Sequence, residues 1–102
     1  MKKIYIAGPI TGNANYREDF KAAERILSNK YITVNPVKII DEFARFMNKP
    51  IDDIPYNLIL KIVLQKLMEC DAIYLLKGWE FSRGAIPEHA VAVALRLEVL
   101  YQ

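Results

Sequence analysis

Four short runs of β-branched and aromatic residues, separated by longer amphipathic segments, are the feature that most constrains the fold. The runs are Lys3–Ala7, Tyr31–Val34, Asp71–Leu76 and Leu97–Tyr101. Short apolar runs such as the first are typical of strands buried on both faces of a parallel sheet. Because strands and helices alternate along the chain, the sequence predicts an α/β fold with an open, mostly parallel sheet of about four to five strands flanked by helices.

The intervening segments have helical periodicity. We expect helices over Tyr16–Asn29, Val37–Met47, residues 55–69 and the stretch that ends at Leu95. Asn13 or Asn15 is the expected N-cap of the first helix, and Asp52 or Asp53 that of the third. The core faces of the first two helices are expected to consist of Tyr16, Phe20, Ala23 and Leu27, and of Ile39, Ile40, Phe43 and Phe46.

The 55–69 helix is apolar on most of its circumference. Its polar arc holds Lys61, Gln65 and Glu69, but Leu58 and Ile62 interrupt that arc. A helix with so much apolar surface needs more than one packing partner. We therefore expect a homo-oligomer that assembles through residues 55–69.

Length and composition exclude several classes of protein. A chain of 102 residues forms one domain, residues 1–102, and its net charge of +2 is too small to indicate a groove for a nucleic-acid polymer. Its apolar runs are too short for a membrane span or a signal peptide. With one cysteine, Cys70, one histidine and no acidic cluster, we expect a buried thiol in a reducing cytoplasm, no metal site and no cofactor.

Polar loops follow the carboxyl ends of the first and third strands, where ligands bind in open α/β sheets. Behind the second loop lies the stretch SRGAIPEHAVAVAL, in which Glu88 falls at the edge of the apolar face, beside Ala92 and Leu95. The helix N-terminus favours the Glu88 anion, whereas apolar surroundings raise its pKa. This makes Glu88 either a nucleophile, base or acid, or an ordinary first-turn glutamate that complements the helix dipole.

The first loop, GPITGNANY, contains Gly8 and Gly12, which allow tight turns and the close approach of a ligand. It is not a dinucleotide-binding loop, because it lacks GxGxxG and the second strand ends in Asn35-Pro36 instead of an acidic residue. It is not a P-loop, because no GK[ST] follows. Two interpretations remain: a site for one phosphate or a sugar hydroxyl, and a plain strand-to-helix turn.

The second loop, GWEFSRG, offers Ser82, Arg83 and the amide of Gly84 as a phosphate cradle at a helix start. Trp79 either stacks on a base or covers the core, and the core role is favoured. His89 is expected to face solvent.

The segments IYIAGPITG and CDAIYLLKGWEFSRGA, with Glu88 four residues after Gly84, resemble the nucleoside 2-deoxyribosyltransferase-like superfamily. The resemblance covers nearly the whole chain in the same order, and the most similar branch consists of small phage and prophage domains of unassigned function. It implies a flavodoxin- or Rossmann-like sheet and a small-molecule nucleoside or nucleotide as the partner.

The resemblance also implies roles for individual residues. Glu88 matches the nucleophile that attacks the anomeric carbon, Asp71 matches the acid that assists protonation of the base, and Tyr5 matches the residue that orients the glutamate. Gly8, Ile10, Gly12 and Ser82 match positions that bind a 5′-phosphate. We add neighbouring loop residues to the expected substrate-binding set, namely Pro9, Thr11, Trp79, Arg83 and Gly84.

The chain departs from the superfamily pattern at several points. His89 follows Glu88 where a small apolar pair is usual, an acidic residue that some transferases carry just before the glutamate is absent, and the chain is shorter than the transferases. These departures favour hydrolysis over transfer between bases. The alternative function is a non-catalytic module that binds a nucleotide or sugar phosphate.

Overall fold

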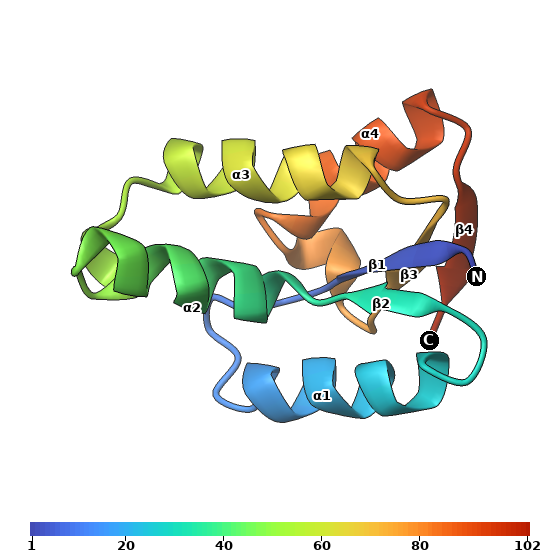
Figure 1. The fold of residues 1–102 in the computed structure, drawn as a ribbon, viewed down its shortest axis with the longest axis horizontal. Helices are drawn as coiled ribbons and strands as arrows, with labels where there is room; N and C mark the ends of the chain where they lie inside the picture. Colours follow the sequence, from blue (N-terminus) through green and yellow to red (C-terminus); the bar gives the residue numbers. More distant parts are fainter.

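The computed structural model describes all residues 1–102 and contains one parallel four-stranded sheet in the order β2-β1-β3-β4. The strands are β1 (Lys3–Ala7), β2 (Ile32–Val34), β3 (Ala72–Leu75) and β4 (Glu98–Tyr101) (Figure 1). Strands and helices alternate along the chain as expected. The predicted fold class is therefore confirmed.

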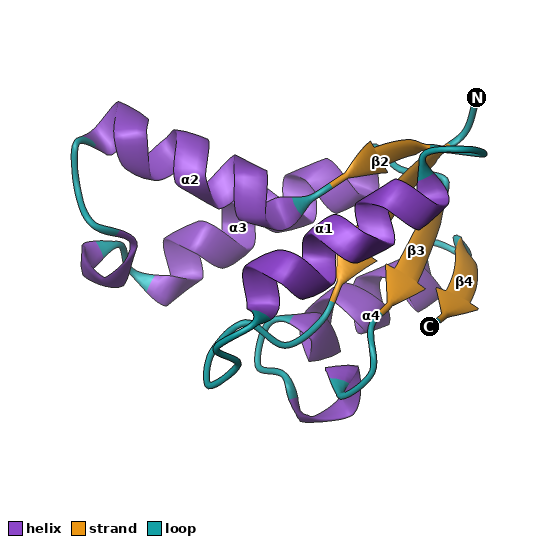
Figure 2. Cartoon of the chain, turned by 90° about the horizontal axis from the view of Figure 1, so that it is seen from below, coloured by secondary structure: helices purple, strands orange, loops and turns teal.

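Helices cover both faces of the sheet. They are α1 (Tyr16–Leu27), α2 (Pro36–Met47), α3 (Tyr56–Met68) and α4 (Ala85–Ala94), with two short 3-10 turns, η1 (Ile51–Asp53) and η2 (Trp79–Phe81). Figures 1 and 2 show α1 alone on one face, and α3 and α4 on the other. Two separate clusters of buried side chains correspond to these two interfaces.

Strand β1 lies in the interior of the sheet, between β2 and β3. Ile4, Tyr5, Ile6 and Ala7 are all fully buried, so the expectation of a strand covered on both faces is confirmed. Successive side chains of a strand point to opposite faces. Ile4 and Ile6 pack in the cluster with α1, whereas Tyr5 and Ala7 pack in the cluster with α3 and α4.

Helix α2 buries the expected face only in part, because Ile39, Ile40 and Phe43 are half-buried. Its buried residues are Pro36, Val37 and Ala44, whereas Phe46 is 85% exposed. The reason is visible in Figure 1, where α2 continues past the ends of the strands and its last turn has no sheet beneath it. Apolar periodicity gives the direction of a face but not the point at which the partner surface ends.

The expected helix caps are also corrected. Asp52 and Asp53 lie in η1, and α3 begins after Pro55 without a side-chain cap. Asn15 precedes α1, but its side chain makes no capping hydrogen bond; the Asn13 side chain instead accepts from the Asn15 amide at 3.1 Å. An unexpected cap is Asn35, whose side chain accepts from the Val37 amide at 3.0 Å.

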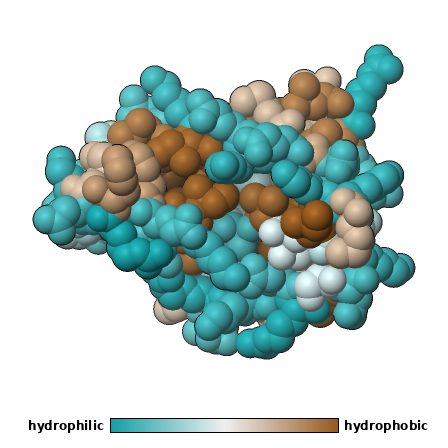
Figure 3. Space-filling view, in the orientation of Figure 1, coloured by the Kyte–Doolittle hydropathy of each residue, from teal (hydrophilic) through white to brown (hydrophobic).

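Apolar surface remains exposed on the α3 and α4 side of the molecule. Leu58 and Ile62 of α3 are half-buried, and Ile86 and Val93 of α4 are 48% and 52% exposed. Figure 3 shows apolar surface along the border between α2 and α3 and over part of α4. None of the helices is both long and apolar enough to cross a membrane.

Candidate functional site

The centre of the candidate site is a buried pair, Tyr5 and Glu88. Tyr5 lies on β1, and Glu88 lies in the first turn of α4, 83 residues further along the chain. The Tyr5 hydroxyl donates a hydrogen bond to Glu88 Oε2. Glu88 is only 5% exposed, so it lies deeper than its expected position at the edge of the apolar face. Strand alternation explains the contact, because it turns Tyr5 toward the face that α4 covers.

Burial dominates the ionisation of this pair. Removal of the Glu88 carboxyl from water raises its pKa from 4.5 to about 8, and the Tyr5 hydrogen bond opposes this shift only in part. Burial and the neighbouring Glu88 together raise the pKa of Tyr5 well above its usual value. Of the two opposing influences expected on Glu88, the apolar environment therefore prevails, and the carboxyl is largely protonated at neutral pH.

Ser82 joins the two polar loops. Its hydroxyl accepts from the Ala85 amide at 3.2 Å, at the start of α4, and lies 3.4 Å from the Gly8 carbonyl oxygen, to which it donates. This contact holds the first loop against the start of the helix that carries Glu88. The Gly84 amide makes no hydrogen bond within the chain and is free for water or a ligand.

The expected binding residues of the first loop have different environments. A Cβ atom on Gly8 would lie 2.7 Å from the Leu76 Cβ, so this glycine is required by packing between β1 and the segment after β3. Gly12 has a φ of 79°, a conformation that glycine adopts without strain. Pro9 and Ile10 are half-buried, while Thr11 and Gly12 are exposed with free backbone amides.

Tyr56, on the first turn of α3, is a contact residue that the sequence did not suggest. Its hydroxyl donates to the Arg83 carbonyl oxygen at 2.8 Å, and the Arg83 guanidinium lies 4.3 Å from the centre of the Tyr56 ring. These contacts attach α3 to the loop that precedes Glu88. They join residues 27 positions apart, so no local pattern could have revealed them.

Trp79 and His89 pack against each other near the same loop. Their ring centres are 4.3 Å apart, and Trp79 covers the cluster of buried residues beneath α3 and α4. The favoured interpretation of Trp79 as a core cover therefore fits the structure. His89 is half-buried rather than turned to solvent, because the Trp79 ring covers it.

Asp71 lies at the amino-terminal ends of the strands, whereas the two polar loops follow their carboxyl-terminal ends. Its carboxylate accepts from the Lys3 amide at 2.9 Å, at the amino ends of β1 and β3. Asp71 precedes Leu75, the last residue of β3, by four positions, which corresponds to about 13 Å along a strand. The structure therefore does not bring Asp71 together with Glu88, and its expected role as a proton donor does not fit this position.

Two surface cavities lie elsewhere on the molecule. A cavity of about 360 Å³ adjoins Trp79 and the end of β4, and another of about 500 Å³ lies between α1 and α2. Neither is lined by Tyr5 or Glu88. Glu88 is 5% exposed, so only a small part of its side chain is open to a ligand in this conformation. No group of three or more His, Cys, Asp and Glu side chains is placed to hold a metal ion.

Comparisons with known proteins agree with this fold. A family model described as "Domain of unknown function (DUF4406)" matches residues 2–101. Among solved structures, a 2-desoxiribosyltransferase from Leishmania mexicana is similar, with a TM-score of 0.69 and 20% sequence identity. The match covers 99% of this chain and 63% of that protein. This likeness shows that the chain has a deoxyribosyltransferase-like fold. The comparison with curated proteins gave no match.

Proposed function

The chain belongs to the DUF4406 family of domains of unknown function, and we propose that it cleaves the N-glycosidic bond of a deoxynucleoside or deoxynucleoside 5′-monophosphate. The observation that carries this proposal is the buried Tyr5–Glu88 pair beside two polar loops. The name of the structurally similar protein, a 2-desoxiribosyltransferase, supports the same class of chemistry.

In this proposal Glu88 is the nucleophile. Glu88 first gives up its proton to water, and the carboxylate so formed attacks the anomeric carbon. The carbon–nitrogen bond breaks, and its electron pair leaves with the base, which takes a proton from water. Water then attacks the anomeric carbon of the glycosyl ester, releases the sugar and regenerates Glu88. The cationic character of the transition state suits a carboxylate at this position.

Tyr5 is the orienting residue. Its hydrogen bond fixes one carboxyl oxygen of Glu88, which leaves the other oxygen for attack. The free amides of Thr11, Gly12 and Gly84, together with Arg83, are the proposed contacts for the sugar or its phosphate. Because Asp71 lies at the amino-terminal ends of the strands, away from Glu88, protonation of the base is assigned to solvent.

Base release tests the proposal. The protein is incubated with the four deoxynucleoside 5′-monophosphates and the four deoxynucleosides, and free base is measured by chromatography. We expect release by the wild type and by Glu80→Gln, a control for an exposed carboxylate, and a loss of about a hundredfold or more in Glu88→Gln. Absence of release from all eight compounds, or release that is unchanged in Glu88→Gln, contradicts the proposal.

A second candidate is binding without turnover. It is favoured by the absence of any other buried carboxyl group near Glu88, which has only Tyr5 as a hydrogen-bond partner. Here the loops hold a nucleotide and Glu88 contacts the sugar. A rise in melting temperature with added nucleotide, together with nucleotide that is recovered intact, distinguishes this candidate from catalysis.

We also propose that the chain forms a homo-oligomer through α3. The support is the apolar surface at Leu58 and Ile62, which the fold leaves only half-buried. In such an assembly the loops beside Glu88 lie close to a neighbouring copy, because Tyr56 of the same helix bonds to Arg83.

A further inference from the structure

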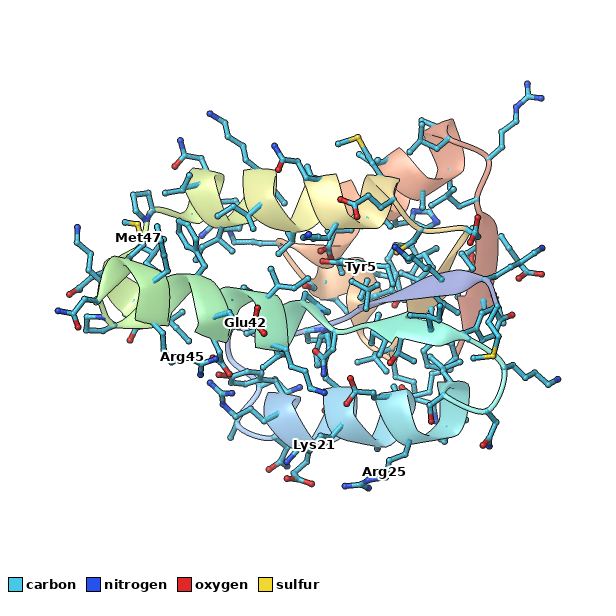
Figure 4. The ribbon with its side chains drawn as sticks, in the orientation of Figure 1. Tyr5, Lys21, Arg25, Glu42, Arg45 and Met47 are labelled. Atoms are coloured by element: carbon cyan, nitrogen blue, oxygen red, sulfur yellow. The ribbon has the colours of Figure 1, made fainter.

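The cavity between α1 and α2 is separate from the Glu88 site and has its own chemistry. It is an open surface groove with a volume of about 500 Å³, and α1, α2 and the turn after α2 all line it. The lining residues that matter are Arg17, Asp41, Arg45, Asn48, Lys49 and Ile51. Figure 4 shows the Arg45 side chain on the side of α2 that faces α1.

One guanidinium in this cavity is held in a fixed orientation. Arg17 Nη1 and Nη2 donate to the two carboxylate oxygens of Asp41 at 2.7 and 3.0 Å. These bonds, together with the charge of Arg45, hold the pKa of Asp41 below its usual value. A guanidinium has five N–H donors, so Arg17 keeps three for another acceptor.

Positive charge in the cavity exceeds negative charge. Asp41 is its one carboxylate, whereas Arg17, Arg45 and Lys49 are cationic. The molecule has two ion pairs, Arg17–Asp41 and Lys38–Glu24, so neither Arg45 nor Lys49 is paired. The cavity thus holds two uncompensated positive charges, as many as the net charge of the entire chain.

We propose that this cavity binds the phosphate group of a small molecule. An oriented guanidinium, a second arginine and a lysine are the donors that bind phosphate oxygens by charge-assisted hydrogen bonds. The Asn48 side chain adds a neutral donor, and Ile51 provides an apolar surface for the organic part of the ligand. This site does not depend on the proposed function of Glu88, because the two sites share no residue.

Backbone amide NMR can locate the binding. Isotope-labelled protein is titrated at low ionic strength with inorganic phosphate, with pyrophosphate and with deoxyadenosine 5′-monophosphate. We expect saturable shifts at residue 17, at residues 44–49 and at residue 51. Equal affinity for inorganic phosphate and the nucleotide shows that the phosphate group alone is recognised, and tighter binding of the nucleotide shows that the organic part also contributes.

A matched pair of double variants separates a site from a general charge effect. Arg45→Ala/Lys49→Ala and Lys21→Ala/Arg25→Ala remove the same charge, but Lys21 and Arg25 project from α1 away from α2 (Figure 4). We expect the first pair to weaken phosphate binding about tenfold or more and the second to leave it nearly unchanged. Glu88→Gln is expected to retain the binding. Absence of saturable shifts at residues 17, 44–49 and 51, or equal weakening by both double variants, overturns the proposal.

Discussion

Glu88 is the residue whose environment has the strongest consequences for stability. Its pKa is about 8 in the folded protein, against 4.5 when it is exposed. The folded state therefore binds the Glu88 proton more tightly than the unfolded state does. Between pH 4.5 and about 8 this group makes the free energy of unfolding fall as pH rises, by on the order of 3 kcal/mol at pH 7.

Substitution of Glu88 by glutamine removes this pH dependence. The amide oxygen still accepts from the Tyr5 hydroxyl, but the side chain cannot ionise. We expect Glu88→Gln to match the wild type near pH 4.5 and to exceed it by on the order of 3 kcal/mol at pH 7, as measured by urea unfolding at several pH values. The control Glu80→Gln should follow the wild type. Parallel pH profiles for Glu88→Gln and the wild type would show that Glu88 does not ionise in this way.

Removal of the Tyr5 hydroxyl changes the pKa of Glu88 without removing the carboxyl group. The hydroxyl stabilises the Glu88 anion, so Tyr5→Phe is expected to raise the pKa of Glu88 further. Carbon NMR of the Glu88 side-chain carboxyl measures this directly. Tyr74→Phe is the control, because Tyr74 lies on the neighbouring strand but packs in the cluster with α1. An unchanged or lowered pKa in Tyr5→Phe is the result that this explanation cannot accommodate.

At the scale of elements, the start of α4 is held from two directions. Ser82 connects it to the loop after β1, and the Tyr56–Arg83 contacts connect it to α3. Because Glu88 is only 5% exposed and lies in this helix, we expect these contacts to affect how a ligand reaches it.

Tyr56→Phe should loosen this segment. The change removes the hydrogen bond to the Arg83 carbonyl but keeps the ring beneath the guanidinium, a loss of about 1 kcal/mol. We expect amide hydrogen exchange at Ala85 and Ile86, whose amides bond to Ser82, to become roughly fivefold faster. Tyr16→Phe is the matched control, because Arg17 lies 5.2 Å from the Tyr16 ring in a similar arrangement. Equal exchange at Ala85 and Ile86 in both variants would mean that Tyr56 does not restrain the loop.

Sequence patterns predicted the elements better than their contacts. The burial of residues 4–7 and the place of Glu88 near the start of an apolar helix followed from local periodicity. The exposure of Phe46 did not, because it depends on where the sheet ends. Asp71 is a different case. Its position at the start of a predicted strand already placed it at the amino-terminal end of the sheet. The superfamily resemblance nevertheless favoured a catalytic role, which the structure does not support.

At the scale of the whole molecule, the strand order places the carboxyl ends of β1 and β3 side by side. This explains how residues 83 positions apart form one buried pair, and it followed from the predicted parallel sheet. Contacts between the helices could not be predicted, because several helices carry apolar residues on more than one face.

Exposed apolar side chains on α3 lead us to expect that the chain associates with itself. We expect the wild type to be oligomeric at about 100 µM, and Leu58→Asp or Ile62→Asp to shift it toward monomer, because a charge cannot be buried unpaired in an apolar interface. Sedimentation analysis measures the change, and circular dichroism checks that the variants are folded. Lys61→Asp, at an exposed position of the same helix, is the control. A wild type that is monomeric at this concentration would contradict the proposed interface.

The proposed reaction requires Glu88 to form a covalent bond with the sugar. The most direct measurement is peptide mass mapping after incubation with a fluorinated deoxynucleoside that forms the glycosyl ester quickly and hydrolyses it slowly. We expect one added sugar, located on the peptide that contains Glu88 and absent in Glu88→Gln. Base release without any adduct on Glu88, or an adduct on another residue that persists in Glu88→Gln, would contradict it.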